Sequence, residues 1–275
     1  MHIAVLVYGR LNKCVEHYDN IMNSIGNEHS IDFFLSSDNS NKDLLDNFIN
    51  LYNPVSYIND EINYSCYDLE KYQTTRGDVT FNNMLCHFIN KQRVYTLLEN
   101  YVEQTNTKYD IIMSIRIDIV FYEKIIFKNV IEENTIYIPS GYDYIDNTIT
   151  DITSYGNMSV MKKYMNIIQN VNYILDTGKS ILHPESLTLA NIILNELKIC
   201  RYDLKYDFIK AEGRRSYINN IIFLSPNIET QPSWNELKNH MTPKHQEELF
   251  LYGVCRVGVN IYIINNGNIN MSQIM

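Results

Sequence analysis

Apolar runs alternate with amphipathic stretches over the first sixty positions of the chain. Continuous apolar runs at 2–9 and 30–40, and a shorter one at 54–59, have the pattern of buried strands. The segments between them, 14–25 and 42–52, suit helices. This strand–helix–strand–helix–strand order predicts an α/β fold with a mostly parallel central sheet flanked by helices.

The rest of the chain continues in the same manner. An irregular loop at 60–79 leads to a long amphipathic helix at 81–104 and an apolar strand at 108–124. The segments predicted next are a strand at 135–140, a loop at 141–156, helices at 158–175 and 183–197, and a strand at 199–209. Residues 211–275 mix short strands with a helix, "PKHQEELFLYG". We therefore interpret 1–210 as the main domain and 211–275 as its C-terminal elaboration.

Composition limits the class of partner. Lys and Arg number 23 against 32 Asp and Glu, and this net charge of −9 argues against nucleic acid as a partner, because phosphate binding needs clustered cations. The five cysteines are scattered and odd in number, which favours a reducing compartment. No apolar stretch reaches about 18 residues, so no membrane span is predicted. We expect a cytoplasmic protein.

Several familiar motifs are missing from the sequence. The turn after the first strand is "YGRLNK", without the GxGxxG of a dinucleotide-binding fold, and there is no GxxxxGK[ST] P-loop. HExxH and GxSxG are absent as well. What remains is an α/β sheet with carboxylates near strand ends, where open α/β folds bind their ligands.

The strand predicted at 108–124 contains a single basic and a single acidic residue, Arg116 and Asp118. Two positions apart, they would point to the same side of an isolated strand. Charges in a core are costly unless they are paired or functional. The pattern therefore leaves two interpretations: an ion pair at the end of a core strand, or part of a binding site.

The segment "IRID" that contains these two residues resembles the Arg-x-Asp variant of the Asp-x-Asp motif of GT-A glycosyltransferases. This variant occurs in glycosyltransferase-like families of lipopolysaccharide and capsule synthesis, the WavE type among them. Other segments follow the order of that family: "IAVLVYGRLN", "IDFFLSSDN", "MLCHFINKQRVYTLLENY", "DITSYGNMSVMKKY" and "HPESLTLANIILNEL". The resemblance spans about 3–209 and rests on the order of its motifs.

The resemblance implies a GT-A-like domain that transfers a sugar from a nucleotide sugar, with a UDP-sugar as first choice, to a hydroxyl group of a glycan in polysaccharide biosynthesis. The residues implied in nucleotide binding are Tyr8, Gly9, Arg10, Asp38, Lys91, Arg93 and Arg116. Structural alternatives stay open for them. Gly9 and Arg10 could form a plain turn, Asp38 could cap the helix near 41, and Lys91 and Arg93 could lie on a solvated face.

A divalent metal, Mn²⁺ or Mg²⁺, is the cofactor that the resemblance implies. Because Arg116 replaces the first acid of Asp-x-Asp, Asp118 would be the only metal ligand from this strand. One carboxylate suffices if phosphate oxygens and waters complete the coordination. Alternatively, the planar guanidinium of Arg116 neutralises the diphosphate itself.

The resemblance also places a catalytic and acceptor-binding region in the second half of the chain. Glu185 is the predicted general base for the acceptor hydroxyl, and Asp151 is the predicted ligand of sugar hydroxyls. Tyr155, Gly156 and His183 would line the sugar and acceptor pocket. In the structural alternative, Glu185 only stabilises the first turn of a helix and Asp151 forms a turn.

Two other functions compete with the transferase. A nucleotide- or glycan-binding protein could keep the fold and have lost turnover, since fold does not fix function. The missing first acid of the motif supports this alternative. A nucleotidyltransferase shares the α/β base, although "YGRLNK" supplies only part of the Gly-rich and basic loop that it needs.

Overall fold

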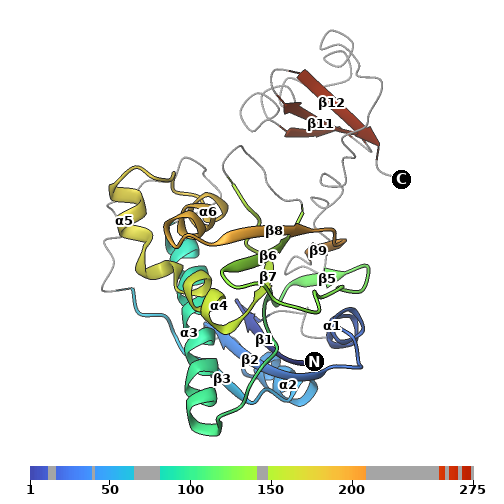
Figure 1. Ribbon diagram of the computed structural model, residues 1–275, viewed down its shortest axis with the longest axis vertical. Helices are drawn as coiled ribbons and strands as arrows, with labels where there is room; N and C mark the ends of the chain where they lie inside the picture. Colours follow the sequence, from blue (N-terminus) through green and yellow to red (C-terminus); the bar gives the residue numbers. More distant parts are fainter. Residues whose placement is uncertain are drawn as a thin grey trace. The chain divides into compact units, whose positions relative to one another are not determined.

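The structure is a computed structural model (Figure 1). It describes residues 1–11, 17–38, 41–64, 81–140 and 148–208, and the backbone of strands at 254–257, 260–265 and 268–273. The chain divides into two compact units, the first comprising 1–140 and 150–216 and the second comprising 141–149 and 217–275. The helix predicted at 243–253 lies outside the described residues.

The first unit is built around a seven-stranded sheet of order β3-β2-β1-β4-β7-β6-β8 (Figure 1). Its strands are β1 (His2–Tyr8), β2 (Ser30–Ser37), β3 (Ser56–Asn59), β4 (Ile111–Arg116), β6 (Thr135–Pro139), β7 (Thr153–Gly156) and β8 (Lys198–Tyr202). All of them run in one direction except β7, which is antiparallel to both neighbours. The predicted α/β fold with a mostly parallel sheet is confirmed.

Helices pack against this sheet or against one another. They are α1 (Tyr18–Ile25), α2 (Lys42–Tyr52), α3 (Phe81–Thr105), α4 (Met158–Met165), α5 (Val171–Asp176) and α6 (Pro184–Leu194), with a 3₁₀ turn η2 (Ile167–Gln169). The long helix α3 contacts β1, β2 and β3, and α4 contacts β4, β6 and β7. The start of α3 shares an apolar cluster with η2, α5 and α6, so these later helices are packed against the long helix that covers β1, β2 and β3.

The apolar strand predicted at 108–124 is two strands. β4 ends at Arg116, residues 117 and 118 form a turn, and β5 (Ile119–Phe121) pairs with β9 (Tyr206–Phe208) in a separate two-stranded sheet. The single-strand prediction is therefore wrong. Arg116 ends a strand of the main sheet, and Asp118 lies in the turn that follows.

Two other predicted boundaries are also wrong. The loop predicted at 141–156 contains β7, whose sequence TSYG is too short and too polar to stand out as a strand. The single helix predicted at 158–175 is interrupted at Asn166 and Asn170, where α4 gives way to η2 and then α5. Asn favours helix ends because its side chain competes for backbone hydrogen bonds.

The second unit contains a three-stranded antiparallel sheet. Its strands are β10 (Val254–Val257), β11 (Asn260–Asn265) and β12 (Asn268–Gln273). Short strands were predicted in this part of the chain, and these confirm them. In the part of the chain that the structure describes, no helix is both long enough and apolar enough to cross a bilayer.

Candidate functional site

The carboxyl ends of β1 and β4 lie side by side and form the base of the candidate site. Tyr8, the last residue of β1, is in register with Arg116, the last residue of β4. Because β7 is antiparallel to β4, the chain enters β7 at this same edge. There the Arg116 N–H donates to the Ile152 carbonyl at 3.1 Å, and the Tyr8 hydroxyl donates to the Asp151 carbonyl at 2.8 Å.

Arg116 and Asp118 form a two-pronged ion pair across the turn. Arg116 Nε donates to Asp118 Oδ1 at 3.0 Å, and Nη2 donates to Oδ2 at 2.7 Å. Burial opposes the charge on the guanidinium, but the carboxylates of Asp118 and Asp151 outweigh it and raise the Arg116 pKa above its ordinary value. The side chains are 35% and 19% exposed, so the pair lies at a surface rather than sealed in the core.

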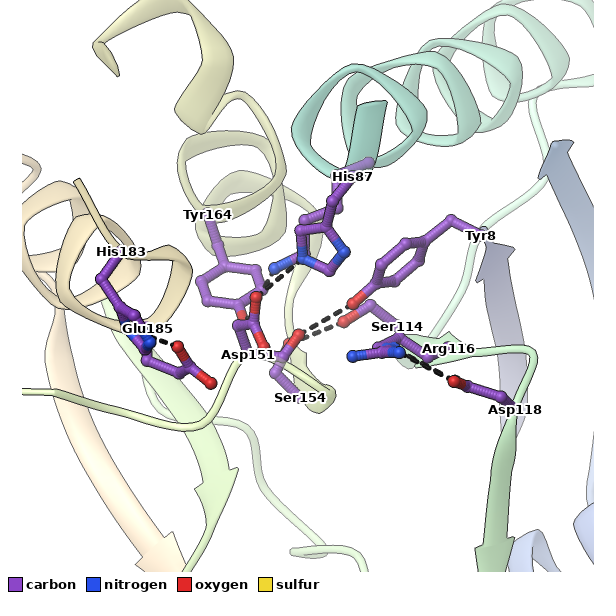
Figure 2. A network of polar contacts seen from close by, with 11 residues as sticks. Tyr8, His87, Ser114, Arg116, Asp118, Asp151, Ser154, Tyr164, His183 and Glu185 are labelled. Carbon is purple, nitrogen blue, oxygen red and sulfur yellow. Dashed lines mark hydrogen bonds and ion pairs between the residues drawn. The ribbon is translucent and has the colours of Figure 1, made fainter. Parts of the chain in front are cut away.

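Asp151 lies at the centre of the charged groups in Figure 2 and is almost fully buried. Its Oδ2 is 2.7 Å from Nε2 of His87, a close polar contact that lacks the alignment of a good hydrogen bond. Burial alone would raise the Asp151 pKa, but His87, Lys91 and Arg116 reverse this and hold it well below its usual range. Asp151 is therefore a buried anion stabilised by the charges of Lys91 and Arg116, while burial lowers the pKa of His87 and favours its neutral imidazole.

Lys91 lies one helical turn after His87 on α3 and is fully buried. Its ammonium group is 3.3 Å from the Tyr164 hydroxyl and lies over the rings of Tyr164 and Tyr8, at 4.5 and 5.5 Å from their centroids. Burial lowers its pKa to about 8, although Asp151 and Glu185 oppose the shift. A solvated face, the structural alternative for Lys91, is wrong. The amine lies behind Tyr8, within electrostatic range of Asp151.

Sequence reasoning missed several members of this network. His87 is one, and its i, i+4 spacing to Lys91 on a predicted helix was the available signal. Ser114 and Ser154, in register on β4 and β7, are buried with their hydroxyl oxygens 2.7 Å apart. Tyr164 comes from α4, within the helix predicted at 158–175. Single serines and tyrosines carry no spacing signal, so only the fold brings them together (Figure 2).

His183 and Glu185 form a second contact at the start of α6. His183 is the N-cap residue, Pro184 begins the helix, and Glu185 lies in its first turn. His183 Nδ1 is 2.6 Å from Glu185 Oε2, and His183 is buried. The Glu185 charge contributes to the pKa of Lys91, so the α6 carboxylate belongs to the same electrostatic environment as Asp151.

Gly9, Arg10 and Asp38 lie at the ends of β1 and β2. Gly9 has φ +118°, which only glycine adopts without strain, and its N–H donates to the Ser36 carbonyl at 3.1 Å. Arg10 Nη2 binds Asp38 Oδ2 at 3.0 Å, and this carboxylate raises the Arg10 pKa. Asp38 does not cap α2, since Asn41 is its N-cap and accepts from the Asp43 N–H at 2.8 Å.

Arg93 is directed away from the network. Its Nη1 donates to the Asp60 carbonyl at 3.1 Å. Two positions after Lys91, it is rotated by about 200° around the helix axis, so the two side chains leave opposite sides of α3. The structure therefore gives no support to the prediction that both contact one nucleotide.

Tyr155 and Gly156 are packing residues rather than pocket residues. The Tyr155 ring is fully buried and stacks on Tyr137, with centroids 4.7 Å apart. A Cβ on Gly156 would lie 3.1 Å from Cγ1 of Val160, so this glycine allows α4 to approach β7. Neither residue presents an exposed group to a sugar, and we correct their predicted acceptor-binding role for this reason.

The donor groups present do not make a metal centre by themselves. Within the described residues, no three His, Cys, Asp or Glu side chains gather in a metal-binding arrangement. Asp118, the predicted ligand, has both carboxylate oxygens bound by Arg116. The expected Mn²⁺ or Mg²⁺ therefore stays a prediction that depends on phosphate oxygens for most of its ligands.

Comparisons with known proteins find similarity among solved structures. No family model matches the chain, and no curated protein matches it. Among solved structures, a crystal structure of an active-site mutant of LgtC, a GT-A glycosyltransferase, superposes with a TM-score of 0.44 at 11% sequence identity. The alignment covers 73% of this chain and 72% of that one. A similarity this weak carries no inference about the chemistry of the present chain.

Proposed function

We propose that this chain is a glycosyltransferase of the GT-A type that uses a nucleotide sugar, with a UDP-sugar as the first candidate. The observation that carries the proposal is the position of Arg116. Its partly exposed guanidinium ends β4 beside the end of β1, and β1 separates β2 and β3 on one side from β4 on the other. Open α/β sheets bind ligands at such a reversal of strand order, outside the carboxyl ends of the strands.

In the proposed reaction, an acceptor hydroxyl attacks the anomeric carbon of the donor. The bond from that carbon to the phosphate oxygen breaks, and the nucleoside diphosphate leaves with the bonding electrons. Arg116 neutralises the developing charge through its planar fork, and the exposed Arg10 is a second candidate cation at the same edge. Holding donor and acceptor together supplies the rest of the rate enhancement.

Glu185 is the proposed general base, which takes the acceptor proton. Its Oε2 contacts His183 Nδ1, which fixes the orientation of the carboxylate at the start of α6. Asp151 is too buried to bind a sugar hydroxyl, and we propose instead that it anchors the network beneath Tyr8. The reaction with a side-chain base implies inversion at the anomeric carbon.

Metal assistance is a separate part of the proposal and no step above depends on it. A bound divalent metal would neutralise the diphosphate together with Arg116. Comparing UDP binding in Mn²⁺ with binding in EDTA would measure its contribution.

A second candidate function is a nucleotide- or glycan-binding protein without turnover. The specific observation in its favour is that Arg116 and Asp118 satisfy each other, which leaves Asp118 committed to a side chain rather than to a substrate or metal. Such a protein would bind the nucleotide sugar and release it unchanged.

The deciding experiment uses the full chain with a panel of UDP-sugars and other nucleotide sugars. UDP at about one hundred times its Kd should stabilise the folded protein by about 2.7 kcal/mol. One donor should be hydrolysed slowly without acceptor, and Glu185→Gln should bind that donor but not hydrolyse it. Binding without turnover of any donor would favour the second candidate. No binding of any nucleotide, with or without metal, would exclude both.

A further inference from the structure

The ion pair between Arg116 and Asp118 has the geometry of an arginine bound to an external oxyanion. Two parallel N–H···O bonds of 3.0 and 2.7 Å join the guanidinium fork to the two carboxylate oxygens. A phosphate group offers the same fork two oxygens at comparable spacing. Asp118 therefore occupies on Arg116 the positions that a bound phosphate would use.

The location of the pair makes an exchange of partners possible. Arg116 is anchored by its backbone, because its N–H donates to Ile152 and its strand is held between β1 and β7. Asp118 lies in the two-residue turn after β4, and its side chain is partly exposed, so it can rotate toward solvent. The backbone of Arg116 is thus held by the sheet, whereas the carboxylate of Asp118 extends from a turn.

We infer that Asp118 acts as an internal competitor for Arg116, which gives up the carboxylate when the diphosphate of a nucleotide binds. This inference rests on the proposed function for the identity of the ligand. The inferred role differs from that of a metal ligand. Without ligand, the Asp118 carboxylate binds the Arg116 guanidinium, and it competes with the phosphate for that guanidinium. The released carboxylate then becomes available to other groups in the site only after the diphosphate has bound.

The cost of the exchange appears in the affinity for oxyanions. A protein whose binding-competent state is only partly populated binds with an affinity reduced by that fraction. Removing the carboxylate without changing its shape should leave Arg116 permanently competent. The inference therefore predicts that the loss of an acid from the proposed metal motif increases the affinity for diphosphate in the absence of metal.

The test is calorimetric titration of inorganic pyrophosphate into the full chain in EDTA at constant ionic strength. Asp118→Asn should bind pyrophosphate about five- to tenfold more tightly than the wild type, the range expected from releasing a charge-assisted pair at a partly exposed site. Arg116→Lys, which keeps the charge but not the fork, should bind at least about tenfold more weakly. Glu99→Gln is the control. It removes a carboxylate on α3 that is paired with Lys162 on α4, and it should leave the affinity unchanged.

Removing any nearby negative charge could also favour an anion, and nuclear magnetic resonance separates this effect from exchange. The Arg116 Nε–H resonance is identified by its loss in Arg116→Lys. In the exchange, this resonance differs between the wild type and Asp118→Asn without ligand and converges when both are saturated with pyrophosphate. If the two spectra stay apart at saturation, Arg116 keeps Asp118 while the anion binds, and the inference is wrong.

Two other results of the titrations would also refute the exchange of partners at Arg116. Equal or weaker pyrophosphate binding by Asp118→Asn, or no pyrophosphate binding by any variant, would overturn the inference. Failure of the proposed function looks different, because tighter pyrophosphate binding by Asp118→Asn would persist while no nucleotide sugar is turned over.

Discussion

His87 Nε2 lies 2.7 Å from Asp151 Oδ2, so helix α3 places an imidazole against a carboxylate two residues before the start of β7. The backbone carbonyl of Asp151 in turn accepts a hydrogen bond from the Tyr8 hydroxyl. The contact thus ties the end of β1, the long helix and the start of the antiparallel strand into one arrangement. Its energetic importance can be measured, because both side chains are largely buried.

A double-mutant cycle with His87→Gln and Asp151→Asn should show strong coupling. Each single change leaves the other buried polar group without its partner, which costs about 1–3 kcal/mol. The double variant should be less unstable than the sum of the two, with a coupling free energy of about 1–3 kcal/mol. Denaturant unfolding at pH 7 provides the measurement. Additive losses would mean that the two groups do not interact.

Lys91 should make the stability of the protein depend on alkaline pH. Its pKa in the folded state is about 8, below the 10.5 of an ordinary lysine, because burial disfavours the charged form. Between these two values the unfolded chain binds the proton and the folded chain does not, so stability rises with pH. Below pH 8 the amine is protonated in both states and the penalty for burying its charge is fully present.

The change in stability assigned to this one amine is at most about 3 kcal/mol over the whole interval. We expect Lys91→Met to remove it. The difference in unfolding free energy between wild type and variant, followed from pH 7 to 10, should therefore shift in favour of the wild type as the pH rises. A constant difference would show that Lys91 titrates as an exposed lysine does.

The sequence was sufficient for the elements whose apolar pattern reflects burial. β1 and β2 are central strands covered by helices, so both faces are apolar and the run is continuous, and α3 has one face against the sheet. β7 was not predicted from the sequence, because a four-residue strand between two others is held by its neighbours and needs no apolar run of its own. The turn at 117–118 was not predicted either, because Ile117 and Ile119 continue the apolar pattern of a single strand.

The candidate site was predictable where a motif placed charge at a strand end. Arg116 and Asp118 follow that rule, and the structure places both at the carboxyl edge, where Gly9 also lies. The role of Asp151 was not predictable, because it depends on His87 from a helix some sixty positions away. The resemblance assigned Tyr155 and Gly156 to a pocket, but β7 lies between β4 and β6, and the fold directs Tyr155 into the core against Tyr137.

Two glycines should respond to alanine for different reasons. At Gly156 the new Cβ would lie 3.1 Å from Cγ1 of Val160, which makes Gly156→Ala a packing defect that costs about 1–3 kcal/mol. At Gly9 the nearest atom is Ile117 Cγ2 at 3.9 Å, so only the φ of +118° opposes a side chain there. Gly9→Ala should cost about 1–2 kcal/mol through backbone strain.

A second substitution separates these two mechanisms. Val160→Ala removes the atom that the Cβ at position 156 would meet, so it should recover part of the stability lost in Gly156→Ala and none of that lost in Gly9→Ala. Thermal unfolding of the three single and two double variants gives the answer. Equal recovery in both backgrounds, or in neither, would contradict the packing role of Gly156.

Glu185 should control turnover but not donor binding. If it takes the acceptor proton, Glu185→Gln keeps the size and polarity of the side chain and removes the base, and kcat should fall by about 10²–10⁴. Because the amide can still contact His183, the Kd for UDP and the thermal stability should change little. Glu99→Gln makes the same chemical change at a surface ion pair with Lys162, and its kcat should match the wild type. Transfer assays with a competent donor measure kcat, and calorimetry measures the Kd. A Glu185→Gln variant with normal kcat would assign this carboxylate to the stability of the first turn of α6 and require the base to be sought elsewhere.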